Sequence, residues 1–309
     1  MIKIIDYSHW KEYEGASEGS GRSEKIWLKS SNGEIGLFKF PKIDPVDKKE
    51  TTEHVSEHLA HKIGKELGVS TATVDIGEYN GRIGSMSYFV CRENEILMEG
   101  IWLISAKFPQ YNIEKMQDEE DGRYYCLDHL FDTAPKFFLK RAYIEMLIFD
   151  FLIGNSDRHQ SNWAILIKTS LEDQSISIRR CPLYDNGSSL CCYVNSEEVI
   201  PLLGKDKNRF NALVDSKSRS TIRVDGSKKG LPSHREVVRY LFENYAVSKQ
   251  IAKEFILKLT PEVVDKLLNE YPKEILAEEK KKLISKFLNR KISILQELLE
   301  EVGDNDAER

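Results

Sequence analysis

The amino-acid sequence lacks the marks of several large protein classes. Its five cysteines are an odd number without a CxxC spacing, so we expect reduced thiols and neither a disulfide framework nor a zinc knuckle. The N-terminus becomes polar after five residues, and no stretch approaches the roughly 18 uncharged apolar residues of a membrane helix. We therefore expect a cytoplasmic protein, although export by a machinery that reads no cleavable signal stays open.

A surplus of positive charge is missing as well. Charged residues make up 31% of the 309 residues, but the formal net charge is only −5, so direct nucleic-acid binding through general electrostatic attraction is not expected. The chain contains no internal repeat, and its acidic end at 304–309 is expected to fray. A chain of this length can bury a sizeable core in one or two lobes.

Residues 1–92 are predicted to form an N-terminal lobe with a small antiparallel sheet and one helix. Strand-like segments lie at 25–28, 35–40, 71–76 and 82–90. A helix is predicted from about Thr51 to Leu67, because apolar residues recur there at four-residue steps.

Residues 93–309 are predicted to form a helical C-terminal lobe, because the composition changes from β-rich to α-rich near Phe89 to Asn94. The apolar run 137–153 predicts a buried helix, and 163–167 and 175–178 predict two short strands after it. Ser233, Ser248 and Thr260 are candidate helix caps.

The most informative pattern is Asn155-Ser-Asp-Arg-His-Gln-Ser-Asn162, followed 23 positions later by Asp185-Asn-Gly. An Asp, an Asn five residues on and a second Asp are the residue set of a phosphoryl-transfer site. Asp157 would accept the proton of the attacking hydroxyl, and Asn162 and Asp185 would hold Mg²⁺ through hard oxygen ligands. The alternative is two ordinary surface turns, which the long apolar flank disfavours.

Further pieces of a nucleotide site precede this pattern. The segment 14–25 is rich in Gly and Ser, so backbone amides of Gly19, Ser20 and Gly21 are candidates to approach phosphates, although such composition also makes floppy loops. Lys39, in a strand-like segment, would reach the phosphates, and Glu57 on the following helix would hold Lys39.

The same helix contains a competing pattern, His54-Val-Ser-Glu-His58, with His61 extending the face. This H-x-x-E-H spacing is typical of one class of zinc peptidases. We disfavour that interpretation, because such histidines on an amphipathic helix are usually solvated and because a peptidase leaves Asp157, Asn162 and Asp185 unexplained.

The candidate residues of the phosphoryl-transfer site, taken together, resemble those of the HipA-like serine/threonine kinases, in particular the small single-module members of the cell-translocating type. The resemblance is carried by 25–28, 38–41, Ser56-Glu57, Leu67-Gly68, 152–163 and 182–190. It implies an α+β, two-lobed protein-kinase-like fold of the HipA and phosphoinositide-kinase type, with a β-rich N-lobe and a helical C-lobe. It also implies ATP and Mg²⁺ as cofactors, Lys39 on the phosphates, Asp157 as catalytic base and Asn162 and Asp185 as metal ligands. The full set expected to contact the nucleotide is Gly19, Ser20, Gly21, Lys25, Lys39, Phe89, Val90, Cys91, His159, Asn162 and Asp185.

The resemblance also bears on regulation and partners. Family members phosphorylate themselves on serine, in some cases within the Gly-rich loop, so Ser17, Ser20 and Ser23 are candidates. Larger members have an extra N-terminal segment and act as toxins neutralised by a DNA-binding antitoxin. This chain begins almost at the Gly-rich loop, so an antitoxin-like partner is compatible with the sequence but not implied by it.

The substrate is the least determined part of the prediction. Residues 205–230 contain eight basic and three acidic residues, which favours an acidic target, a phosphoinositide head group or a target bound to nucleic acid, or else makes a solvated loop. A protein with Ser or Thr acceptors is the leading substrate. One alternative is a small-molecule or phosphoinositide-type kinase, since the order Gly-Asn-Ser-Asp-Arg-His-x-x-Asn at 154–162 also resembles the catalytic loop of phosphoinositide kinases. The other alternative is a non-catalytic kinase-like binding module.

Overall fold

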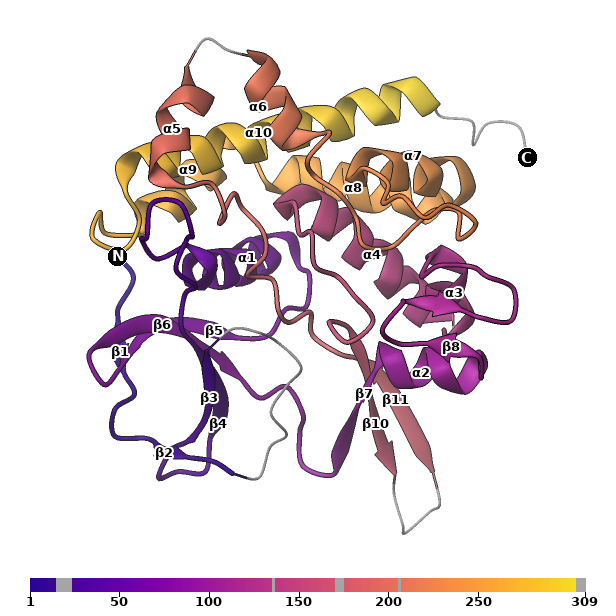
Figure 1. Ribbon diagram of the computed structural model, residues 1–309, viewed down its shortest axis with the longest axis horizontal. Helices are drawn as coiled ribbons and strands as arrows, with labels where there is room; N and C mark the ends of the chain where they lie inside the picture. The colour runs from indigo at the N-terminus through magenta and orange to yellow at the C-terminus, as the bar shows by residue number, and fades with distance from the viewer. Residues whose placement is uncertain (15–23, 135–136, 170–174, 205–206, 304–309) are drawn as a thin grey trace. The chain divides into compact units, whose positions relative to one another are not determined.

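The structure is a computed structural model that describes residues 1–14, 24–134, 137–169, 175–204 and 207–303. The chain forms two compact units, each assembled from segments that lie far apart in the sequence (Figure 1). The first unit contains Met1–Val90, Tyr184–Phe210 and Leu259–Asn289, and the second contains Cys91–Leu183, Asn211–Lys258 and Arg290–Arg309.

The first unit is built on a six-stranded sheet in the order β1-β5-β6-β4-β3-β2. Neighbouring strands are antiparallel, except that β1 and β5 are parallel. The strands are β1 Ile5–Asp6, β2 Lys11–Glu12, β3 Lys25–Lys29, β4 Ile35–Lys39, β5 Val74–Tyr79 and β6 Arg82–Tyr88. All four predicted strands are present, the third displaced toward the C-terminus, whereas β1 and β2 are too short to give a sequence signal.

One face of this sheet buries an aromatic cluster. Phe38 of β4, Leu28 of β3 and Met86 of β6 are fully buried, together with Tyr7 and Trp10. Phe38 and Lys39 point to opposite faces of the sheet, because successive side chains of a strand alternate. Burial of Phe38 therefore directs Lys39 away from the aromatic cluster.

The predicted helix is α1, Glu53–Leu67, which contacts β5 and β6. Its apolar positions Val55, Leu59, Ile63 and Leu67 are buried, and Gly68 ends it with a positive φ of 81°, a conformation that glycine adopts without a steric penalty. The remaining helices of the first unit are α5 Ser196–Leu203, α9 Pro261–Asn269 and the N-terminal parts of α6 Lys207–Val214 and α10 Glu278–Val302.

Two of the three histidines of α1, His54 and His58, are buried and not solvated, so this part of the prediction was wrong for them. His54 and His58 are 8% and 7% exposed, and His58 Nδ1 lies 2.7 Å from the hydroxyl of Tyr271. Burial lowers the pKa of both imidazoles to about 4. Within the described parts of the chain, no group of three or more His, Cys, Asp or Glu side chains is arranged to hold a metal ion.

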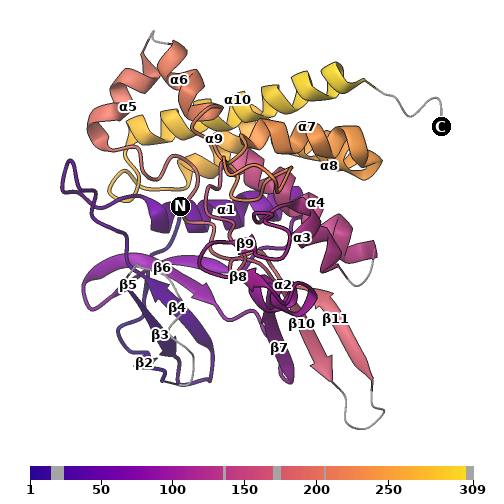
Figure 2. The same ribbon diagram turned by 45° about the vertical axis from the view of Figure 1, so that its right-hand side comes forward.

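The second unit combines a three-stranded sheet with a group of helices (Figure 2). The sheet has the order β11-β10-β7, with β7 Glu95–Glu99, β10 Ala164–Thr169 and β11 Ile176–Arg180, and is antiparallel throughout. The hairpin of β10 and β11 was predicted and β7 was not. The second unit also contains a small hairpin of β8 Tyr111–Asn112 and β9 Gln117–Asp118.

The predicted buried helix is α4, Phe137–Ile153, which contacts α7 His234–Asn244 and α8 Ala246–Lys258. The unit also contains α2 Gly100–Lys107 and α3 Leu127–Asp132. Caps at Ser233 and Thr260 are confirmed. Ser248 is not a cap, because it lies inside α8 and its hydroxyl donates to the carbonyl of Leu241 at 2.8 Å.

Two further expectations concern disulfide bonds and membrane-spanning helices. All five cysteines are free thiols, as predicted. None of the helices in the described ranges combines the length and the apolar character that crossing a membrane requires.

Candidate active site

The catalytic loop, which we define as residues 155–162, begins where α4 ends. Gly154 has a φ of 67° and turns the chain out of the helix. The backbone N–H of Asp157 donates to Asn155 Oδ1 at 3.1 Å, and Asn162 Nδ2 donates to the carbonyl of Asp157 at 2.7 Å. The loop is thus closed on itself around an exposed Asp157.

A buried ion pair holds this loop against the helix before it. Arg158 Nε and Nη2 donate to the two carboxylate oxygens of Asp150 on α4, at 2.9 and 2.8 Å. Arg158 Nη1 donates to the carbonyl of Asn162 at 2.6 Å. The two charged side chains are only 2% and 3% exposed, so the bidentate geometry fixes the loop in a dry environment. Arg158 therefore supports the loop.

The far end of the loop is held by α2. The N–H of Gly100 donates to the carbonyl of Trp163 and that of Ile101 to the carbonyl of Gln160, both at 2.8 Å. A Cβ atom on Gly100 would lie 2.2 Å from the indole of Trp163, so only glycine permits this approach. Trp163 is buried and donates its indole N–H to the hydroxyl of Tyr125 at 2.7 Å.

In the first unit, Lys39, Glu57 and Asp185 come together. Lys39 Nζ lies 2.6 Å from Asp185 Oδ1 and 3.7 Å from Glu57 Oε2. Glu57 is 2% exposed, and its Oε1 accepts the backbone N–H of Asn186 at 2.8 Å. Asp185 has a φ of 56°, a left-handed conformation that Asp tolerates better than most residues. Glu57 therefore holds both the lysine and the backbone of the Asp185 loop, which we define as residues 184–190.

The two carboxylates also set the charge state of Lys39. Burial alone would lower the pKa of this amine, but the negative charges of Asp185 and Glu57 outweigh it and raise the pKa above its ordinary value. Lys39 is therefore a fixed cation at neutral pH. A cation held between two carboxylates can be shared with a phosphate when one arrives.

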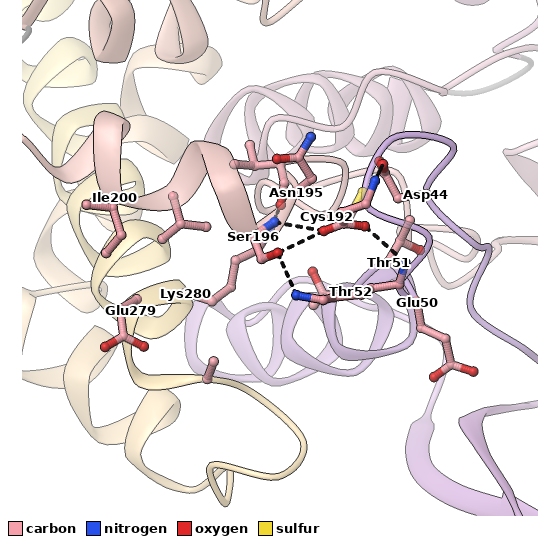
Figure 3. Close-up of a pocket in the computed structure, with 15 residues that line it drawn as sticks. Asp44, Glu50, Thr51, Thr52, Cys192, Asn195, Ser196, Ile200, Glu279 and Lys280 are labelled. Atoms are coloured by element: carbon pink, nitrogen blue, oxygen red, sulfur yellow. Dashed lines mark hydrogen bonds between the residues drawn. The ribbon is translucent and has the colours of Figure 1, made fainter.

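The segment that follows the Asp185 loop borders a pocket of about 390 Å³ within the first unit (Figure 3). The backbone N–H of Thr52, at the start of α1, donates to the carbonyl of Cys192 at 3.5 Å. Lys280 Nζ, from α10, donates to the carbonyls of Cys191 and Val194 at 2.6 Å each. Burial lowers the pKa of Lys280. These contacts fix where the chain goes after Asp185.

The other residues that were expected to contact the nucleotide lie in several different elements of the two units. Lys25 of β3 is the cross-strand partner of Lys39. Phe89 is 48% exposed, and its ring contacts Trp27. Val90 is the last residue of the first segment of the first unit, and Cys91 is the first residue of the second unit. In the catalytic loop, the imidazole of His159 accepts the backbone N–H of Ser161 at 3.2 Å. Gly19, Ser20 and Gly21, with the candidate phosphorylation sites Ser17, Ser20 and Ser23, lie outside the described residues.

Sequence reasoning missed three residues that support these loops: Asp150, Gly100 and Lys280. Asp150 is a charged residue inside an otherwise apolar helical run, and that is a usable signal, because a buried carboxylate needs a cationic partner. Gly100 and Lys280 had no local signal, because their partners lie 60 or more positions away.

Comparison with known proteins identified a sequence relative and solved structures of similar fold. No family model matches the chain. The chain is 26% identical over 235 residues to the serine/threonine-protein kinase CtkA of Helicobacter pylori, which covers 74% of this chain and 68% of the relative. The crystal structure of the H. pylori proinflammatory kinase CtkA superposes with a TM-score of 0.77 and 20% identity, over 97% of this chain and 100% of CtkA. HipA from the Shewanella oneidensis HipA–HipB–operator DNA complex superposes with a TM-score of 0.56 and 14% identity, over 97% of this chain and 69% of HipA.

These likenesses define the fold of the protein. The fold is the α+β kinase-like fold of HipA and CtkA, with a β-rich N-lobe and a largely helical C-terminal region. With the sequence match added, the chain is similar in both sequence and fold to the serine/threonine-protein kinase CtkA.

Proposed function

We propose that the chain is an ATP- and magnesium-dependent serine/threonine kinase that phosphorylates itself. The observation that carries the proposal is the catalytic loop, in which a fully buried ion pair and a closed set of hydrogen bonds hold an exposed Asp157. Holding a carboxylate in this way costs conformational freedom. That cost is explained if the carboxylate must accept a proton at a defined position.

In the proposed reaction, a serine or threonine hydroxyl oxygen forms a bond to the γ-phosphorus of ATP. The bond from that phosphorus to the oxygen bridging to the β-phosphate breaks, ADP leaves, and the hydroxyl proton goes to the carboxylate of Asp157. Asp157 thus orients the acceptor and takes its proton, while Lys39 binds the phosphates of the nucleotide.

Asn162 and Asp185 are the proposed magnesium ligands, and their chemistry fits this role. The amide nitrogen of Asn162 is used in the bond to the carbonyl of Asp157, so the amide oxygen is the atom available as a ligand. Asp185 offers a carboxylate whose side chain is 43% exposed, and oxygen donors of these two kinds are those that Mg²⁺ prefers. The bound ion would neutralise negative charge on the transferring phosphoryl group.

Glu57 has a positioning role in this proposal. It holds Lys39 and the backbone of Asn186, and both contacts lie within the first unit. Lys25, Phe89, Val90, Cys91 and His159 are proposed to contact the nucleotide, on the strength of the family resemblance.

The test is the intact mass of the purified protein after incubation with Mg-ATP, beside Asp157→Ala and Asp185→Asn variants. One or more added phosphoryl groups on the wild type alone are expected, and peptide mapping would then show whether Ser17, Ser20 or Ser23 is modified. Unmodified wild type that still binds ATP and magnesium would contradict self-phosphorylation and favour a small-molecule or phosphoinositide-type kinase. Wild-type protein that is neither modified nor able to bind ATP would favour a non-catalytic binding module.

The relationship to HipA raises a partner as a second question. The HipA structure in the comparison contains HipB and operator DNA, so an antitoxin-like protein partner is compatible with the fold. Co-purification of a stoichiometric small protein with the tagged chain from its own host would support such a partner.

A further inference from the structure

A loop of the second unit, residues 216–233, folds back on itself; we call it the basic loop. Arg219 Nη1 donates to the carbonyl of Leu231 at 3.0 Å, and the N–H of Ser220 donates to the carbonyl of Pro232 at 3.0 Å. Arg223 Nη2 donates to the carbonyl of Lys229 at 2.8 Å. The two limbs of the loop are therefore fastened together by backbone and guanidinium contacts.

The basic loop is also fastened to the catalytic loop. Thr221 Oγ1 donates to the carbonyl of Ser156 at 2.9 Å, and Ser156 directly precedes Asp157. At the base of the loop, Ser218 Oγ lies 2.9 Å from His234 Nδ1 and accepts from Lys291 Nζ at 2.9 Å. The anchor is buried, because Ser218, Thr221, His234 and Lys291 are all less than 9% exposed. The position of the basic loop relative to Asp157 is thus set by specific contacts within one unit.

The exposed side chains around this anchor are mostly cationic. Lys217, Arg219, Lys228 and Lys229 are exposed, against one exposed acid within the loop, Asp225. Arg219 is two residues from Thr221, so their Cα atoms are at most about 7 Å apart. Lys229 is brought to the same region because its carbonyl binds Arg223.

One neighbouring acid is already engaged. The carboxylate of Glu236 accepts the backbone N–H of Ser233 at 2.6 Å in a helix capping box. Arg219 and Lys228 lie close enough to contribute to the lowered pKa of Glu236, after the larger effect of its hydrogen bonds to Ser233. The exposed charged side chains of the basic loop are therefore four cations and one acid, in a protein whose net charge is −5.

We propose that the basic loop is the docking surface for the acceptor polypeptide and that it selects segments with Asp or Glu beside the phosphorylated Ser or Thr. The inference deepens the proposed kinase function and rests on it. A fixed cationic surface next to the base attracts an acidic segment and places its hydroxyl near Asp157. A peptide with basic flanks meets like charges there and is disfavoured.

The experiment compares three peptides with one central serine and acidic, neutral or basic flanks. Steady-state phosphorylation gives kcat/KM, and anisotropy of labelled peptides with alanine in place of serine gives binding without catalysis. We expect the acidic peptide to bind and react about tenfold better than the neutral one at low salt. That preference should fall as ionic strength rises to about 0.5 M, since exposed charges are then screened.

The decisive variant is Lys228→Glu/Lys229→Glu, with Lys3→Glu/Lys282→Glu as a control. All four lysines are exposed, and both variants change the net charge equally. We expect the first variant to lose the acidic preference, about tenfold in KM, and the control to keep it, with ATP affinity and melting temperature unchanged in both.

Each outcome bears on one of the two proposals. An acidic preference that survives in Lys228→Glu/Lys229→Glu, or equal binding of the three alanine peptides, would overturn the docking proposal. Charge-dependent binding without any phosphorylation would keep the docking surface and reject the kinase function. Anionic vesicles or single-stranded RNA that bind at the same lysines, with no binding of acidic peptide, would also overturn the proposal.

Discussion

The catalytic loop and the Asp185 loop differ in where their supporting contacts come from. The ion pair at the centre of the catalytic loop is local, since Asp150, Arg158 and Asn162 lie within 12 positions and are almost completely buried, and the more distant α2 and Thr221 add hydrogen bonds at its ends. The Asp185 loop is held by Glu57 and Lys39, which lie 129 and 146 positions away and belong to the sheet and helix of the first unit.

The difference separates two ways of preorganising a site. A loop fixed by a local, buried ion pair is part of the folding core of its unit, so damage to it should appear first as lost stability. The Asp185 loop relies on Lys39 and Asp185, which remain 19% and 43% exposed, besides the buried Glu57, so a change at Asp185 should lose function at little cost in stability. The following predictions test this contrast.

The largest expected effect is that of Asp150→Ala on the stability of the second unit. The substitution leaves the Arg158 guanidinium buried without its carboxylate, which costs about 3–5 kcal/mol. Chemical denaturation would measure the loss. Glu119→Ala is the matched control, because it breaks an exposed ion pair with Lys115 in the same unit and should cost at most about 1 kcal/mol. Equal losses would refute the assignment of Asp150 to the folding core.

Asp185→Asn should show the opposite pattern. Asn keeps the shape of the side chain and tolerates a φ of 56°, so the melting temperature should hardly change. The lost negative charge weakens the contact with Lys39 and the binding of the metal, so turnover should fall at least about 100-fold. Phosphoryl transfer and thermal unfolding of one preparation decide the matter. Asp132→Asn, at an exposed acid of α3 outside the proposed metal site and the basic loop, is the control that should leave turnover intact.

Both units should lose stability in mild acid. Burial lowers the pKa of His234 in the second unit to about 3 and that of His58 in the first to about 4. In both, the unfolded chain binds a proton below about pH 6.5 and the folded chain does not, so stability is complete above that pH and falls below it. Each histidine contributes about 1.4 kcal/mol per pH unit until its folded pKa is reached.

Single substitutions separate the two contributions. His234→Gln and His58→Gln should each flatten the dependence of unfolding free energy on pH between 6.5 and 5. A slope that either variant leaves unchanged would show that the imidazole it removes is not the acid-sensitive group. The comparison also tells whether the unit that contains the catalytic loop is the more acid-sensitive one.

The same contrast explains how much the sequence could predict. The buried helix α4, the hairpin after it and the octapeptide Asn155–Asn162 were recognisable because their interactions lie within a short window. The strand of Lys39, the helix of Glu57 and the pairing of these two residues were also predicted, and the structure places their charged groups 3.7 Å apart.

What the sequence did not show depends on tertiary packing. The histidines of α1 look like a polar face, yet His58 is buried because Tyr271, 213 positions away, covers it. Lys280 gave no local sign that it binds the carbonyls after the Asp185 loop. The two-residue strands β1 and β2 carry too few residues for a periodic pattern. β7 is as long as β3 but lies in the part that was predicted to be helical. All three strands form because neighbouring strands present hydrogen-bonding edges.

The smallest expected effect concerns the two functions of Glu57. Glu57→Gln retains an oxygen that can accept the N–H of Asn186 but removes the charge that faces Lys39, whereas Glu57→Ala removes both. We expect Gln to raise KM for ATP about fivefold, which is about 1 kcal/mol, and Ala to add a similar loss in kcat because the Asp185 loop is no longer held.

A control on the same helix makes this small difference measurable. Glu66→Gln changes an exposed residue of α1 by the same atoms and should leave KM and kcat unchanged. If Gln and Ala at position 57 behave alike, the bond to Asn186 contributes nothing and the negative charge of Glu57 that faces Lys39 is the whole effect. If Gln behaves like the wild type, the backbone bond is the important contact, and the Asp185 loop is then positioned by neutral hydrogen bonding, as the catalytic loop is around Asn155 and Asn162.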